Sequence, residues 1–126
     1  MEFIRITGSN EKLLDINLKD ILTNIKNGSH FNWCVLHIEG IGNNTKESII
    51  EFENKVNKSE NGLLINWNEL TKLSEKFSQI INLLLIGDKD STKLIRYQDF
   101  GLMYKECFYV IELVDSSYWE IRSKQD

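Results

Sequence analysis

Two apolar, strand-like segments near the C-terminus are separated by only three polar residues. Residues 107–114 form the strongest strand candidate in the chain, residues 118–122 form another, and Asp115, Ser116 and Ser117 lie between them. Such a pattern predicts a hairpin whose turn holds Asp115 and Ser116. If the turn spans these three residues, Val114 faces Tyr118 and Glu112 faces Glu120 across the two strands.

The remainder of the chain alternates between strand-like and helix-like patterns. Strands are predicted at residues 3–7, 31–41, 63–65, 80–86 and 93–97. Helices are predicted after the cap residues Asn17, Asn44 and Asn66, each followed by an acid three residues later. This order predicts a single α+β domain over residues 1–126. We expect a mixed β-sheet, about three helices and a C-terminal antiparallel meander.

Length and composition place the chain among ordinary globular domains. Its 126 residues are 41% apolar and 27% charged, which is enough to bury a core without disulfide or metal support. The first residues lack a basic segment followed by an apolar run, and the apolar stretch around residues 80–86 is too short to cross a bilayer. We therefore expect a cytoplasmic protein with reduced cysteines and no membrane partner.

The sequence offers weak candidates for catalysis. Cys34 and His37 are three apart on one predicted strand, so their side chains are expected on opposite faces. A dyad of Cys34 with a distant histidine and an acid pair of Glu112 with Glu120 both stay open as ways to build a small hydrolase.

No cofactor or metal site is predicted. The two histidines and two cysteines are too dispersed for zinc, and residues 40–42 lack the further glycine or lysine of a phosphate-binding loop. Lysine and arginine are thinly spread, so direct binding of nucleic acid is not expected.

Charge is distributed unevenly along the chain. The formal net charge is −4, and residues 99–120 alone hold five acids and one lysine. Alternation on the last strand directs Trp119 and Ile121 toward the core and leaves Tyr118, Glu120 and Arg122 outside. An acidic surface with an aromatic side chain favours a basic protein partner. The predicted contact residues are Asp88, Asp90, Asp99, Glu112, Asp115, Tyr118 and Glu120.

Two segments carry a resemblance to a known class of proteins. They are Ile65-Asn66-Trp67-Asn68-Glu69-Leu70, with the apolar strand that follows it and ends at Gly87, and residues 111–121. Together they resemble small bacterial immunity proteins of polymorphic or contact-dependent toxin systems. The resemblance implies a single-domain protein without catalytic residues that binds and blocks a cognate toxin, such as a basic nuclease. The alternative reading is a regulatory binding module for another basic protein or peptide.

Overall fold

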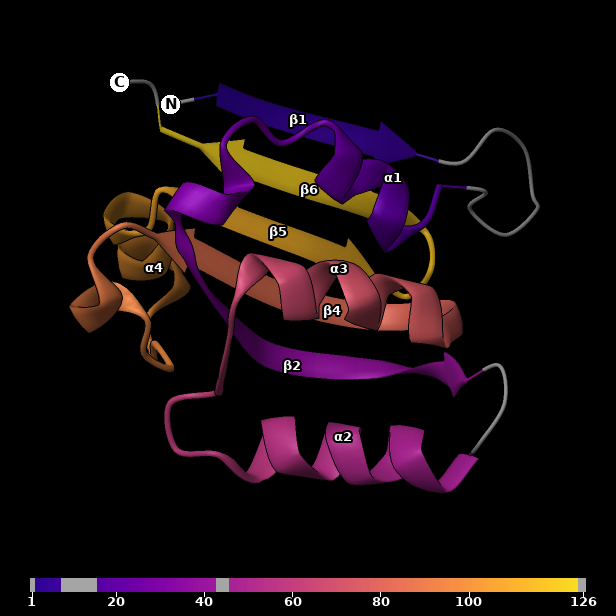
Figure 1. Cartoon of the computed structure of the whole chain (residues 1–126). Coiled ribbons are helices and arrows are strands. Elements are labelled where there is room, and N and C mark those ends of the chain that lie inside the picture. The colour runs from indigo at the N-terminus through magenta and orange to yellow at the C-terminus, as the bar shows by residue number, and fades with distance from the viewer. Residues whose placement is uncertain (1, 8–15, 43–45, 125–126) are drawn as a thin grey trace.

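Six strands form one sheet in the order β1-β6-β5-β4-β2-β3 (Figure 1). The structure is a computed structural model that describes residues 2–7, 16–42 and 46–124. Its strands are β1 (Glu2–Thr7), β2 (Asn32–Gly42), β3 (Leu63–Ile65), β4 (Phe77–Asp88), β5 (Tyr109–Val114) and β6 (Tyr118–Ser123). Its helices are α1 (Leu18–Thr23), α2 (Lys46–Lys58), α3 (Trp67–Lys76) and α4 (Phe100–Glu106), with short 3-10 turns at Gly28–His30 and Ser91–Lys93.

The α+β class is confirmed, but the expectation of a mixed sheet is wrong. Every neighbouring pair of strands is antiparallel, including the predicted meander β4-β5-β6. The strand–helix–strand order suggested parallel crossovers. Instead, β1 pairs antiparallel with β6 at one edge of the sheet. At the other edge, β2 and β3, which α2 connects, also pair antiparallel. The strands β3 and β4, joined through α3, do run in the same direction, but β2 lies between them, so no two neighbouring strands are parallel.

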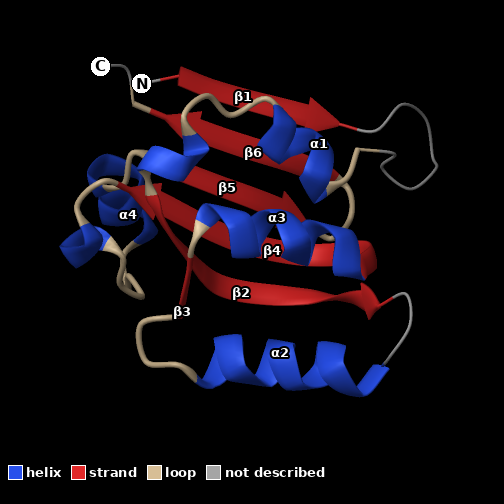
Figure 2. Cartoon of the chain, in the orientation of Figure 1, coloured by secondary structure: helices blue, strands red, loops and turns tan. Residues whose placement is uncertain are grey.

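The helices α1 and α3 lie across one face of the sheet, and α2 runs alongside β2 (Figures 1 and 2). A large apolar core lies beneath them, with Trp33, Leu85, Ile111 and Trp119 all inaccessible to solvent. The apolar stripes of the helices supply the other half of this core, as for Leu18 of α1 at 1% exposure. Burial of this kind is the main stabilising term of such a domain.

Two of the predicted helix starts are confirmed at atomic detail. The Asn17 side chain accepts a hydrogen bond from the Asp20 N–H at 3.0 Å, and the Asp20 carboxylate accepts one from the Asn17 N–H at 3.0 Å. Asn66 and Glu69 form the same reciprocal arrangement at the start of α3. Each capping box satisfies amide groups that a helix end otherwise leaves unpaired. The third predicted cap, Asn44, lies outside the described residues.

The segment at residues 88–108 connects β4 to β5 and departs from the sequence prediction. We name it the excursion. No strand forms at residues 93–97; the chain makes a 3-10 turn at Ser91–Lys93 and later the unpredicted helix α4. Leu94 and Tyr97 are buried here in a second apolar cluster. Helix α4 was not predicted because its seven residues are too few to show a helical periodicity, and because Gly101 in its first turn disfavours a helix.

Candidate functional site

The two faces of the sheet are covered to different extents. The excursion folds against the face opposite α1 and α3, where the buried side chains of Leu36, Ile86, Met103 and Val110 form much of the second cluster. Over β1, β6 and β5, this face carries charged and aromatic side chains in place of the aliphatic side chains of the second cluster. We call that region the open sheet face. It is carried by Phe3, Arg5, Glu112, Tyr118, Glu120 and Arg122, and bordered by Phe100 and Tyr104 of α4.

The strand register places these residues as the sequence predicts. Glu112 pairs with Glu120 and Val114 with Tyr118 across the hairpin. Trp119 is fully buried on the other face, and its indole N–H donates to the Ile16 carbonyl at 2.9 Å. The prediction that Trp119 is core and that Tyr118, Glu120 and Arg122 share the opposite face is confirmed. The N-terminal strand adds Phe3 opposite Arg122 and Arg5 opposite Glu120.

Arginine side chains compensate the two opposed glutamates. The Arg122 guanidinium lies 3.1 Å from Glu112 Oε1 and 3.7 Å from Glu120 Oε1. On the other side, Arg5 Nε donates to Glu120 Oε2 at 2.8 Å. These contacts remove the like-charge repulsion that facing glutamates would otherwise cause. Glu120 is only 7% exposed as a result, so this acid, which was expected on the outer surface, is buried within the network.

Tyr104 connects α4 to the same network. Its hydroxyl donates to Glu112 Oε1 at 2.8 Å. Burial, followed by the hydrogen bond to Glu112, raises the pKa of Tyr104 to about 12. The phenol therefore stays neutral and acts as a donor over the whole neutral pH range. Arg96 takes no part in this network; its guanidinium donates to the carbonyls of Leu36, Val56 and Ser59.

Aromatic rings surround the two arginines. The Arg122 guanidinium carbon lies 3.9 Å from the Tyr104 ring centroid and 4.6 Å from that of Phe3. The Arg5 guanidinium lies 4.7 Å from the Tyr118 ring centroid. The Phe100 and Tyr104 rings are in edge contact at 6.4 Å. We call the six residues the aromatic–arginine surface: Phe3, Arg5, Phe100, Tyr104, Tyr118 and Arg122.

This surface is continuous and accessible. Phe3 is 49% exposed and Phe100 48% exposed, and the Arg5 side chain is 53% exposed. Five of its six members were missing from the predicted contact set, which contained only Tyr118; one of the five, Arg122, had been placed outward without a role. Phe3 and Arg5 come from β1, and Arg5 is 115 positions from its partner Glu120. No local pattern connects two strands that are so distant in the chain.

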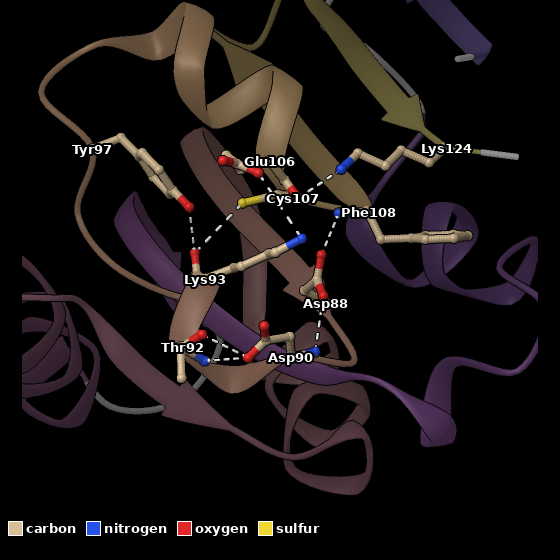
Figure 3. Close-up of polar contacts among 9 residues, drawn as sticks. All are labelled: Asp88, Asp90, Thr92, Lys93, Tyr97, Glu106, Cys107, Phe108 and Lys124. Atoms are coloured by element: carbon tan, nitrogen blue, oxygen red, sulfur yellow. Dashed lines mark hydrogen bonds and ion pairs between the residues drawn. The ribbon is translucent and has the colours of Figure 1, made fainter. Parts of the chain in front are cut away.

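Asp88 is a structural residue and not the surface acid that the sequence suggested. It is 7% exposed, and its two carboxylate oxygens accept from the Asp90 N–H at 2.8 Å and the Phe108 N–H at 2.9 Å (Figure 3). The carboxylate thus ties together the two ends of the excursion. Nearby, Lys93 pairs with Glu106 at 3.9 Å, and Lys124 donates to the Glu106 carbonyl at 2.7 Å (Figure 3).

The three other predicted acids are exposed but lie apart. Asp90 accepts from the Thr92 amide at 3.0 Å and hydroxyl at 2.6 Å, and these hydrogen bonds lower its pKa. Asp99 caps α4 by accepting from the Gly101 N–H at 2.8 Å. Asp115 lies in the β5–β6 turn with a φ of 52°, and its N–H donates to Asn82 Oδ1 at 2.9 Å. The predicted acids therefore divide among the excursion, the open sheet face and the turn.

The Cys34–His37 argument from strand parity is wrong in its geometry. The register of β2 against β4 shifts between Val35 and His37, so that Cys34 pairs with Ile86 and His37 with Leu84 on the same face. Cys34 is nevertheless fully buried, and its thiol donates to the Asn61 carbonyl at 3.2 Å. Burial raises the pKa of Cys34 to about 11. The thiol is therefore protonated at neutral pH, unlike an activated nucleophile.

Among the residues that the structure describes, no three His, Cys, Asp or Glu side chains gather as a metal site would require. In the same part of the chain, no helix combines the length and the apolar character needed for a membrane crossing. Comparison with protein-family models, with curated proteins and with solved structures finds no match to this chain.

Proposed function

We propose that this chain is an immunity protein that binds a cognate bacterial toxin domain and occludes its active site. The observation that carries the proposal is the aromatic–arginine surface, a continuous and accessible set of rings and guanidinium groups on the open sheet face. Tyrosine, phenylalanine and arginine are the side chains enriched at protein interfaces and at their energetic hot spots. The resemblance of residues 65–87 and 111–121 to immunity proteins points to the same class.

The surface is organised before any partner arrives, which supports a role in binding. Arg122 is fixed by Glu112, Glu120 and two rings, and its side chain is only 20% exposed. Side chains already held in one arrangement lose little rotamer entropy on association. A surface whose side chains are already held in place suits occlusion of a preformed active site.

The charge distribution supports a basic toxin such as a nuclease as the partner. The acids at the centre of the surface are paired with arginines, so the acids that would attract a basic partner are those outside it. Glu112 and Glu120 are balanced by Arg122 and Arg5 at the centre of the surface. The exposed acids lie outside that centre, Asp90 and Asp99 on the excursion and Asp115 in the β5–β6 turn, in a chain of net charge −4. Peripheral acids accelerate encounter with a basic partner, while central rings supply affinity. We place the complex in the bacterial cytoplasm, where the toxin would act.

The test is co-expression with any basic toxin-like domain that a neighbouring reading frame encodes, scored by growth rescue and by the dissociation constant of the purified complex. Phe100→Ala and Tyr118→Ala are each expected to weaken binding by about tenfold or more, in line with loss of an interface anchor. Ile50→Ala is the matched control, because Ile50 is 53% exposed but lies on α2. Equal affinity for all three variants would refute the assigned surface.

The same surface would also serve a regulatory module for another basic protein. The immunity assignment and the regulatory module differ in whether the partner is a toxin. A stable complex that abolishes toxin activity supports the immunity assignment. A toxin domain that neither binds the chain nor loses activity in its presence removes the immunity assignment, and capture of a non-toxic basic protein through Phe100 and Tyr118 would then support the regulatory module.

A further inference from the structure

A basic groove lies on the opposite side of the sheet from the aromatic–arginine surface. It has a volume of about 240 Å³ and is lined by Lys26, Asn27, His30, Phe31, Lys89, Phe108 and Tyr109. Its walls come from the segment after α1, from the start of β2 and from the ends of β4 and β5. Phe31 and Tyr109 pack with the core beneath α1 and α3, so this groove is separate from the proposed toxin-binding surface.

Three aromatic rings form the apolar part of the groove. The ring centroid of Phe31 lies 4.8 Å from that of Phe108 and 5.2 Å from that of Tyr109, and Phe108 and Tyr109 are 4.9 Å apart. Phe108 and Tyr109 are only partly buried. Rings in mutual edge and tilted contact present a stable apolar wall against which a flat group can pack.

The remainder of the lining is polar and, apart from Asn27, basic. Lys26, His30 and Lys89 are exposed, and no acid contributes to the lining. The ion pairs found among the described residues involve neither Lys26 nor Lys89. Lys89 Nζ instead lies 5.4 Å from the Phe31 ring centroid. Two exposed ammonium groups beside one groove, with no ion pair to a described acid, favour an anion there.

The backbone of this groove is rigidly held. Asn27 adopts a left-handed conformation with a φ of 58°, which starts the 3-10 turn that ends at His30. The next residue, Gly28, lies so close to Trp67 that a Cβ atom would come within 2.5 Å of its ring. The Gly28 carbonyl also accepts from the Trp33 indole N–H at 2.8 Å. A strained residue fixed by its surroundings is a common feature of binding sites.

We propose that this groove binds a small aryl phosphate, a single planar ring that carries one phosphate group. The volume lies below the range of about 300–1,000 Å³ typical of sites for drug-sized ligands, so it suits one ring. A phosphate dianion matches two lysines, with His30 as a further donor. The ring lies against Phe31, Phe108 and Tyr109 while the phosphate takes the exposed basic side.

Phenyl phosphate is the probe, and inorganic phosphate and phenol test its two halves separately. Each compound is titrated into the whole chain, and binding is measured by calorimetry and by tryptophan fluorescence. Fluorescence is suitable because the Trp33 ring stacks on that of Tyr109 with a centroid distance of 5.5 Å. We expect saturable binding of phenyl phosphate that is at least about tenfold tighter than that of either half. Lys26→Ala combined with Lys89→Ala should weaken it by about tenfold or more, and added salt should weaken the wild type most.

Lys105→Ala is the control, because Lys105 is an exposed lysine on α4, away from the groove. Phe108→Leu keeps an apolar side chain and tests the ring contact separately from the charges; it is expected to reduce the advantage of phenyl phosphate over inorganic phosphate. The proposal is overturned if wild type shows no saturable binding, if the double lysine variant binds as tightly as Lys105→Ala, or if inorganic phosphate binds as tightly as phenyl phosphate.

Discussion

The two sides of the β5–β6 hairpin are built from the same strands but have opposite physical character. On the side beneath the helices, Trp119 and Ile111 are fully buried in an apolar core. On the other side, Glu112, Glu120 and Arg122 alternate with them and form a network of ion pairs and ring contacts. One side is held by burial of apolar area, and the other by charges that compensate one another at the surface.

The comparison shows how one hairpin can serve both fold and recognition. The period-2 alternation of a strand separates the two tasks residue by residue. A change on the helix side is expected to alter stability, and a change on the open side is expected to alter the arrangement of the surface with a smaller stability cost. The following variants test that division, in order of expected effect.

Trp119→Ala should have the largest effect on the free energy of unfolding. The side chain is fully buried and its indole N–H is bonded to the Ile16 carbonyl. We expect a loss of about 3–5 kcal/mol, the range for truncation of a large buried aromatic residue. Urea denaturation monitored by far-UV circular dichroism measures it. Ile50→Ala serves as the control and should stay within about 0.5 kcal/mol of wild type. A small effect of Trp119→Ala would mean that the helix-covered side does not dominate stability.

Arg122→Met should cost less, about 2 kcal/mol. It leaves Glu112 and Glu120 facing each other without the guanidinium that lies 3.1 Å and 3.7 Å from them. Glu112→Gln in the same chain removes one charge and should recover part of the loss. The double-mutant cycle in chemical denaturation measures the coupling. If the second substitution adds a further loss, repulsion between the two glutamates is not what destabilises the single variant.

Tyr104→Phe should cost about 1 kcal/mol at pH 8, because the hydrogen bond to Glu112 is lost. The pKa of Tyr104 is raised from its ordinary value of 10 to about 12, so the folded state favours the neutral phenol. The contribution of Tyr104 to the free energy of unfolding is therefore complete below pH 10 and is lost as the pH rises toward 12. The stability difference between wild type and variant should narrow across that window. A constant difference from pH 8 to pH 12 would contradict the contact.

Asp115→Gly should have the smallest effect and the opposite sign. Asp115 and Ser116 both have positive φ angles, 52° and 56°, in the turn that joins the two strands. Glycine adopts this conformation without steric strain, so a gain of about 0.5 kcal/mol is expected. Thermal unfolding compares the variant with wild type. The reference is Asp115→Ala, which removes the same carboxylate but keeps the strained φ and should not be stabilised.

Local features of the fold were predictable because their causes are local. Asn17 and Asn66 cap their helices through residues three positions away. The β5–β6 turn fixes the register of its own hairpin, which places Glu112 opposite Glu120 and sends Trp119 inward. By contrast, the bulge in β2 reversed the expected parity of His37, because a bulge has no reliable signal in a single sequence.

The candidate site was predictable only in part. Tyr118, Glu120 and Arg122 were placed on the correct face by alternation. Arg5 and Phe3 of β1, which lie opposite Glu120 and Arg122, are far from the hairpin in the chain. Tyr104 is only eight positions from its partner Glu112, but it lies on α4, a helix that the sequence pattern did not predict. Asp88 shows the same limit. An acid at the end of a strand is expected to be a solvated loop residue, and only the fold brings the Phe108 N–H to its carboxylate.

The sequence by itself determined the alternation, the helix caps, the hairpin and the α+β class, since each rests on neighbouring residues and on the period of the backbone. The tertiary structure alone decided that β1 pairs with β6, that the excursion folds back onto the sheet and that Arg5 of β1 reaches Glu120 of the hairpin. Charge and burial depend on which distant segments meet, and that is set by packing of the whole chain.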